Sequence, residues 1–242
     1  MSKLLGTIRE RAYWKVVIRP STFVEKRVLD KGTLTHIIRK NAVSYKGWNF
    51  PHIEGAGAVD RGPDWIGQEI DWKPILELWR FYQSGQFVHY FGMVEAWDEN
   101  SAGQWLRPRV GLDVKNAVSQ FTEIFELAAR LSFTDAGDAG MRLEINAGNI
   151  ENCVLFTLPQ RNGTPAWIPQ AVEPSVTVVR ELSSAELVTD KRELALESAS
   201  EFFKSFKWKP HIELLRDMQS AILSSGQSQS VGSCSFEKRL IQ

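Results

Sequence analysis

The chain has 242 residues and no formal net charge, because 29 Lys and Arg residues balance 29 Asp and Glu residues. Hydrophobic residues make up 43% of the sequence and charged residues 24%, a composition typical of ordinary globular proteins. The balanced charge excludes a strongly basic nucleic-acid-binding chain and an acidic tail protein as descriptions of the whole sequence.

The first element expected along the chain is a strand over residues 14–19, where β-branched residues cluster before Pro20. Residues 33–41 follow as a short helix with its apolar side chains on one face. Short strands near residues 49–53 and 68–72 are then expected to flank a loop rich in glycine and acidic residues.

A β-hairpin is predicted within residues 76–95, where two aromatic-rich runs flank Ser84 and Gly85. Glycine supplies the positive φ that tight hairpin turns require. A turn of two residues would place Trp79 opposite Tyr90, as a cross-strand aromatic pair.

Three amphipathic helices are predicted in the second half of the chain. The first covers residues 112–132, with Asp113 as its N-cap. The second begins at Asp190, which has capping-box spacing to Glu193. The third covers residues 212–222.

The strands expected in this half are a hairpin of residues 141–145 and 153–158, and a strand over 175–180 that residues 185–188 could continue. Hairpins and helices in mixed order, without a βαβ rhythm, predict an α+β fold with a mostly antiparallel sheet packed by two or three amphipathic helices.

The length predicts one domain over residues 1–224, within which residues 12–110 and 111–224 could form two similar halves. The Ser/Gly/Gln-rich residues 225–242 are expected to form a flexible tail. No apolar stretch reaches the length of a secretory signal or a membrane span, so we expect a cytoplasmic protein without membrane contact. The two cysteines, Cys153 and Cys234, lack metal-ligand spacing and suit a reducing compartment.

Acidic residues and one histidine gather between positions 52 and 71. In strands, His52 and Glu54 would share one face, and so would Glu69 and Asp71, because side chains alternate. Such a cluster could hold a divalent metal ion, with His52, Glu69 and Asp71 as ligands. A metal-dependent hydrolase or nuclease would then use His52, Glu54, Asp64, Glu69 and Asp71. The other interpretation is a solvated acidic loop with no metal and no catalytic residue.

Six of the nine tryptophans fall between positions 48 and 105. They either belong to the core or line a surface for a partner, since Trp, Tyr and Arg dominate interface hot spots. The candidate Trp/Arg-rich hairpin surface consists of Trp65, Trp79, Arg80, His89, Trp97 and Arg107. A protein partner is expected. Single-stranded nucleic acid could also stack on these rings, but the sequence has no basic run to support it.

Four stretches are similar to a bacterial group of largely uncharacterised proteins: WKVVIRP, GWNFPHI, DWIG and ELWRFYQSGQFVHYF. In that group, W-K-x-x-I-R-P is followed by W-x-F-P-H-I and Y-Q-S-G-Q-F-x-H, alone or joined to schlafen-like modules for ATP or DNA binding. The resemblance covers residues 14–131. It implies a regulatory or defence-linked accessory protein and no catalytic residue, and no ATP-binding motif is visible in this sequence.

The sequence therefore predicts a non-catalytic cytoplasmic interaction or sensor protein that needs no cofactor and binds a protein partner through the hairpin surface. The alternatives are a metal-dependent hydrolase or nuclease with a divalent cofactor, and a nucleic-acid-binding module. The metal alternative requires that the acidic residues converge. The surface requires that Trp65, Trp79 and Trp97 are accessible.

Overall fold

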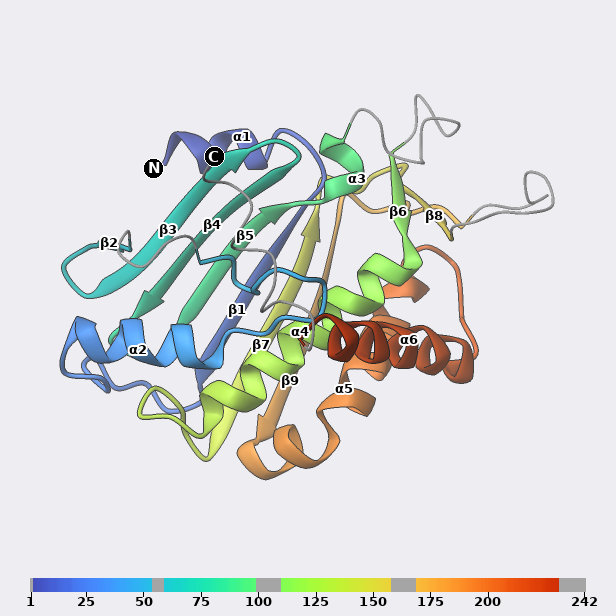
Figure 1. Ribbon diagram of the computed structural model, residues 1–242. Coiled ribbons are helices and arrows are strands. Elements are labelled where there is room, and N and C mark those ends of the chain that lie inside the picture. Colours follow the sequence, from blue (N-terminus) through green and yellow to red (C-terminus); the bar gives the residue numbers. More distant parts are fainter. Residues whose placement is uncertain (1, 54–58, 99–109, 158–168, 231–242) are drawn as a thin grey trace, which may run out of the picture.

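The computed structural model describes residues 2–53, 59–98, 110–157 and 169–230, and its fold is α+β, as predicted. A seven-stranded antiparallel sheet has the order β2-β3-β4-β5-β1-β7-β9, and β6 and β8 form a separate parallel pair (Figure 1). The strands are β1 (Tyr13–Pro20), β2 (Asp60–Arg61), β3 (Trp65–Trp72), β4 (Ile75–Tyr82), β5 (Phe87–Gly92), β6 (Gly111–Asp113), β7 (Gly140–Gly148), β8 (Val154–Phe156) and β9 (Ser175–Ser183). The helices are α1 (Lys3–Ile8), α2 (Lys31–Asn41), α3 (Val94–Trp97), α4 (Val114–Ser132), α5 (Ser184–Lys204) and α6 (Ile212–Ser230).

The predicted strand before Pro20 is β1, and it lies at the centre of the sheet. β1 pairs antiparallel with β5 on one side and with β7 on the other. Strands from residues 12–110 and from residues 111–224 therefore belong to one sheet, and one hydrophobic core runs through both segments.

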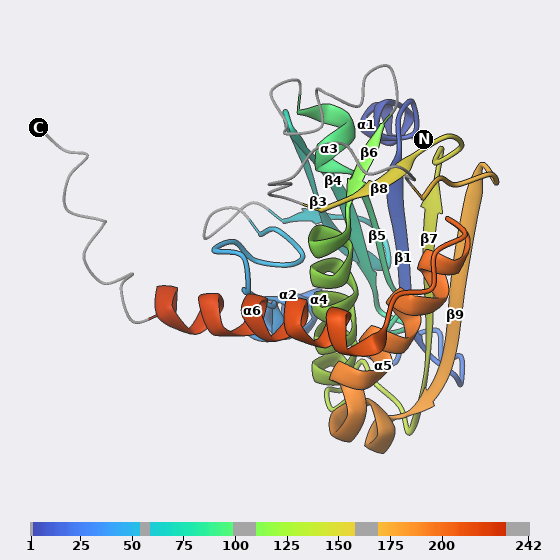
Figure 2. The same ribbon diagram turned by 90° about the vertical axis from the view of Figure 1, so that its right-hand side faces the viewer.

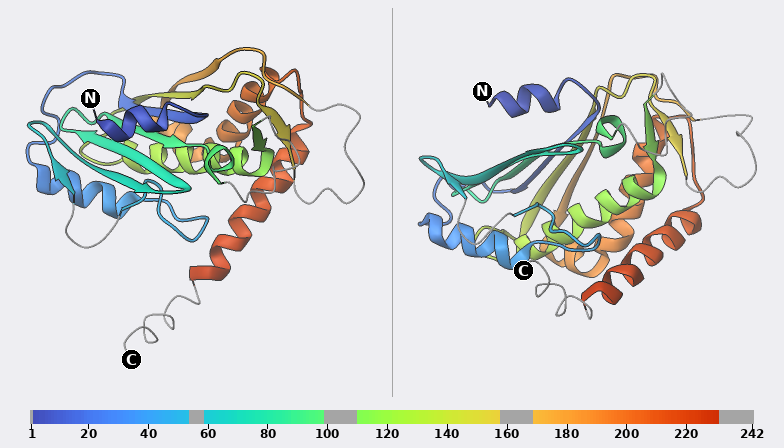
Figure 3. Two further views of the ribbon diagram at one scale, coloured as in Figure 1. Left: turned by 90° about the horizontal axis from the view of Figure 1, so that it is seen from above. Right: turned by 45° about the horizontal axis from the view of Figure 1, so that its top comes forward.

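The two faces of the sheet differ because side chains alternate along each strand. Trp14, Val16 and Ile18 of β1 point to the inner face, where they are buried under the helices. Lys15, between them, points to the outer face and pairs with Glu144 of β7 over 3.3 Å. On this outer face, α1 covers only the region of β4 and β5 (Figure 3).

The hairpin of β4 and β5 is confirmed, but its expected register is wrong by one residue. Trp79 lies opposite His89. The loop has three residues instead of two, because the Tyr82 amide donates to the Gln86 carbonyl over 2.9 Å and Gly85 takes the positive φ of 86°. Since opposite residues share a face, Trp79 and His89 both point to the inner face.

Helices α2, α4 and α5 cover the inner face of the sheet, and α6 packs on α4 and α5 (Figure 2). The Asp113 carboxylate caps α4 as predicted, accepting from the Lys115 amide over 2.8 Å. Gln219 of α6 donates to Thr122 of α4 over 3.1 Å, which fixes the outer helix on the layer below. No helix in the described part of the chain has the length and apolar character that a membrane crossing needs.

Helix α5 begins at Ser184, six residues before the predicted start at Asp190. Its capping box is formed by Ser183 and Glu186, whose side chains each bind the other residue's backbone amide. Residues 185–188 therefore form the first turns of the helix, and their predicted strand is wrong.

Three further predictions about secondary structure are wrong. Residues 49–53 form no strand, and only Phe50 bridges to Val43. The hairpin expected around residues 146–152 does not form, because both edges of β7 are already occupied by β1 and β9. Helix α6 continues to Ser230 and includes the start of the predicted tail. Residues 231–242 lie outside the described residues.

Candidate ligand-binding cleft

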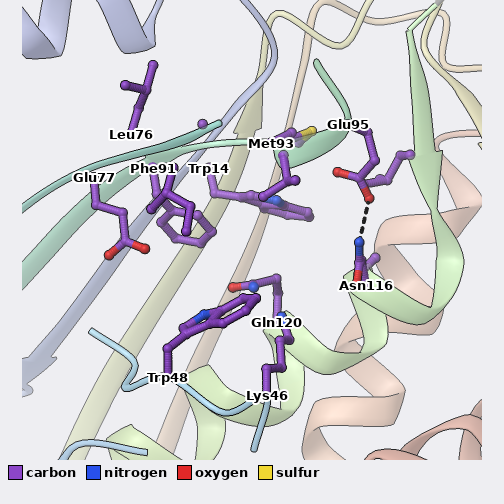
Figure 4. A pocket seen from close by; sticks show the side chains of 15 residues that line it. Trp14, Lys46, Trp48, Leu76, Glu77, Phe91, Met93, Glu95, Asn116 and Gln120 are labelled. Carbon is purple, nitrogen blue, oxygen red and sulfur yellow. Dashed lines mark hydrogen bonds between the residues drawn. The ribbon is translucent and has the colours of Figure 1, made fainter. Parts of the chain in front are cut away.

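A cleft of about 130 Å³ lies between the inner face of the sheet and the first turns of α4 (Figure 4). Strands β4 and β5 form one wall and α4 forms another, while the segment after α2 contributes Lys46 and Trp48. The cleft combines aromatic rings with a few polar groups, a composition typical of small-molecule sites.

The aromatic part of the cleft is built around Trp14. This side chain is 2% exposed, and its ring packs against Phe121 and Phe202 at centroid distances of 5.9 Å and 5.1 Å. Phe91 lies beside it, and Trp48, which is 45% exposed, faces it across the cleft (Figure 4). The inner wall is therefore anchored in the core, whereas Trp48 is open to solvent.

Glu95 of α3 presents a carboxylate to one end of the cleft. Its Oε1 atom accepts from the Asp113 amide over 3.1 Å and from the Asn116 side chain over 3.0 Å. Its other oxygen points toward the space beside Trp14 (Figure 4). Burial raises the pKa of Glu95, and the hydrogen bonds from Asn116 and Asp113 oppose this effect.

Glu77 of β4 lies at the other end of the cleft, and His89 holds it in place. The His89 Nε2 atom is 3.2 Å from the Glu77 carboxylate. The His89 side chain is fully buried among Phe50, Phe87 and Phe91, with ring centroids 5.2, 5.8 and 4.6 Å away. His89 therefore orients Glu77 and cannot reach a ligand.

A buried ion pair lies next to the cleft. The Lys46 amine is 3.2 Å from the Glu123 carboxylate of α4, whose side chain is 1% exposed. Burial raises the pKa of Glu123, and the charge of Lys46 counteracts this effect. Glu77 is close enough to raise the pKa of Glu123 further. Two carboxylates and the Lys46 amine thus line an aromatic space, and the buried Glu123 carboxylate lies next to that amine.

The raised pKa of Glu95 predicts a pH dependence of stability. When the pKa of a carboxyl group is higher in the folded than in the unfolded state, its contribution to stability is complete at pH values below the unfolded-state pKa. This contribution is lost as the pH rises through the folded-state pKa. Asp113 and Cys153 interact electrostatically with Glu95, and both remain in the Glu95→Gln variant. The variant therefore differs from the wild type only in lacking the titratable group of Glu95. We therefore expect urea unfolding to show that Glu95→Gln gains stability over the wild type as the pH rises from 4.5.

The control for this experiment is Glu25→Gln, because Glu25 is exposed. The free energy of unfolding of Glu25→Gln should stay close to that of the wild type at every pH. If the free energies of unfolding of Glu95→Gln and the wild type differ by the same amount at every pH, burial does not disfavour the charged form of Glu95.

Of the five residues proposed for a metal site, the structure describes four, and it does not bring these together: His52, Asp64, Glu69 and Asp71. His52 lies on the inner side of the sheet, where its carbonyl accepts from the Trp79 indole over 3.0 Å. Glu69 points to the outer face and binds Arg80 over 2.7 Å, and Asp71 shares that face. Asp64 is an exposed residue before β3, and Glu54 lies outside the described residues. Among the residues described, no group of three His, Cys, Asp or Glu side chains could hold a metal ion.

The predicted hairpin surface is also not assembled. Trp79 and His89 are 0% exposed and Trp97 is 5% exposed, so these three residues cannot line a binding surface. The hairpin register pairs Trp79 with His89, so both lie on the inner face, while Trp97 packs in the cluster under α1. Trp65 and Arg80 do meet on the outer face, where the guanidinium lies 4.2 Å from the indole centroid. Arg107 lies outside the described residues.

The residues that do surround the cleft include several that the sequence analysis missed. Lys46 and Trp48 lie in a segment without regular structure, where no periodicity marks them. Asn116 and Gln120 of the cleft and the neighbouring buried Glu123 follow the i, i+4, i+7 spacing of one helix face. This polar stripe on a mainly buried helix is the signal that could have indicated a site.

Comparisons with models of protein families, with curated proteins and with solved structures found no match.

Proposed function

We propose that the protein is a non-catalytic sensor whose cleft binds a small organic cation. The observation that carries this proposal is the pair of carboxylates, Glu77 and Glu95, at the two ends of an aromatic space (Figure 4). Carboxylates attract a cation directly, and the faces of indole and phenyl rings attract it through their negative quadrupole.

The size of the cleft limits the ligand. A cavity of about 150 Å³ holds one benzene molecule. A cleft of about 130 Å³ that is partly open to solvent therefore fits a single ring or short alkyl chain bearing one amine. The ligand class is thus an amine of about six to nine non-hydrogen atoms.

The role of His89 supports binding rather than catalysis. A histidine beside a glutamate can act as a general base when it reaches a substrate. Here the ring is enclosed by phenylalanines, and its contact with Glu77 fixes the direction of the carboxylate. A fixed carboxylate binds a cation with less loss of conformational entropy.

The test uses three probes of similar shape: benzylammonium, benzyl alcohol and benzoate. We expect calorimetry to show binding of benzylammonium, roughly tenfold weaker binding of the alcohol, and no binding of benzoate. Glu77→Gln and Glu95→Gln should each weaken benzylammonium binding by roughly tenfold. Asp71→Asn is the matched control, because Asp71 lies on the opposite face of the sheet. Equal binding of the amine and the alcohol would overturn the proposal.

As part of this proposal, the sensor acts in the cytoplasm and passes the binding event to a protein partner. A regulatory or defence-linked setting is supported by the resemblance of residues 14–131 to the bacterial group with the W-K-x-x-I-R-P opening.

A further inference from the structure

Residues 43–50 form a loop that is closed at its base and carries two residues of the cleft. Val43 and Phe50 bridge antiparallel, with both backbone hydrogen bonds formed, at 3.0 Å and 2.6 Å. Gly47 takes a positive φ of 87° between Lys46 and Trp48. The base of the loop is therefore fixed, and Tyr45 holds it further by packing on the core and hydrogen-bonding Glu126, so that residues 46–49 lie beyond these contacts.

Two acceptor atoms near Lys46 lack partners. None of the described residues donates a hydrogen bond to Glu123 Oε1 or to Gln120 Oε1, although both atoms are buried. Lys46 reaches the other oxygen of Glu123, at 3.2 Å. Gln120 and Glu123 are three residues apart on α4, so their side chains are neighbours. The site therefore offers more acceptors than the tethered amine uses.

The buried Glu123 carboxylate needs a cation, because an uncompensated buried charge is strongly destabilising. Exchanging one ammonium group for another keeps this charge compensated. Lys46 can then return to water, where its amine is well hydrated. For a ligand that carries its own ammonium group, the ion pair is replaced and not lost, so the remaining costs are those of immobilising the ligand and moving the tip of the loop.

We propose that Lys46 is a tethered competitor of the ligand, and that a primary ammonium group displaces it from Glu123 and releases the tip of the loop, residues 46–49. This inference rests on the proposed function of the cleft and narrows its ligand to primary amines. A primary ammonium has three N–H donors, which can reach Glu123 and Gln120 together. A quaternary ammonium has none.

The test compares the wild type with Lys46→Ala, using n-propylammonium, which reproduces the atoms that the substitution removes. We expect the variant to bind n-propylammonium roughly tenfold more tightly than the wild type, because its internal competitor is gone. Tetramethylammonium and n-propanol should show no such gain. In the wild type, hydrogen exchange of residues 46–49 should become faster when n-propylammonium binds. Lys40→Ala is the matched control, since Lys40 is an exposed lysine at the end of α2.

Glu123→Gln provides the second variant if Lys46→Ala does not fold. It removes the carboxylate but keeps the loop, and we expect roughly tenfold weaker binding of n-propylammonium. Equal affinity of wild type, Lys46→Ala and Glu123→Gln would overturn the role of Lys46 and leave the cleft as the binding site. No binding of n-propylammonium or benzylammonium to any of these proteins would overturn the proposed function as well.

Discussion

Replacing Gly85 with valine is expected to destabilise the protein by about 2–4 kcal/mol. Gly85 has a φ of 86°, a backbone conformation that β-branched residues resist. A Cβ atom at this position would also lie 2.2 Å from the Ala136 carbonyl oxygen, which is backbone and cannot turn away. Either the hairpin loop or the segment before β7 must shift.

The measurement is urea unfolding of the variant beside Gly6→Ala. Gly6 is the matched control, because a Cβ atom there meets nothing within 4 Å and α1 should gain helix propensity. If Gly85→Val does not fold, Gly85→Ala carries the same backbone clash with a smaller side chain. A loss below about 1 kcal/mol would mean that the three-residue loop does not have this conformation in solution.

The second large effect is expected at the ion pair of Lys46 and Glu123. Lys46→Met leaves Glu123 buried without its cation and should lower the free energy of unfolding by about 3–5 kcal/mol near neutral pH. The loss should shrink as the pH falls, because burial raises the pKa of Glu123 and the protonated group needs no counter-ion.

A double-mutant cycle isolates this interaction. Lys46→Met/Glu123→Gln removes both charges and should be more stable than Lys46→Met alone. Chemical unfolding of the four proteins gives the coupling energy. If the effects of the two single substitutions simply add, the amine and the carboxylate do not interact in solution, and the structural basis for the competition by Lys46 is lost.

Local patterns were enough to predict much of the framework. The apolar spacing of residues 112–132 and the capping side chain of Asp113 identified α4, because helix packing and capping depend on neighbouring residues. Gly85 indicated the position of the hairpin for a similar reason, since the positive φ of a tight turn depends only on the residue at that position. Mixed hairpins and helices indicated the α+β class.

Pairing between distant strands was not predictable in this way. Whether the loop at Gly85 has two or three residues changes every cross-strand pair, because a shift of one residue exchanges the two faces. That shift placed His89 on the buried face of Trp79, so the expected binding surface does not form. His52 and Glu69 likewise lie on opposite sides of the sheet. The spacing of residues 52–71 in the sequence could not show this separation.

The sequence by itself thus determined the fold class, the existence of β1, the position of the hairpin and the approximate positions of α4, α5 and α6, since these follow from periodicity, turns and caps. The tertiary structure alone decided which polar residues meet. Glu77, Glu95, Lys46 and Glu123 come from four separate elements, and each is an unremarkable charge in the sequence. They meet because β4, α3, α4 and the segment after α2 pack around Trp14, and this packing is a long-range property of the fold.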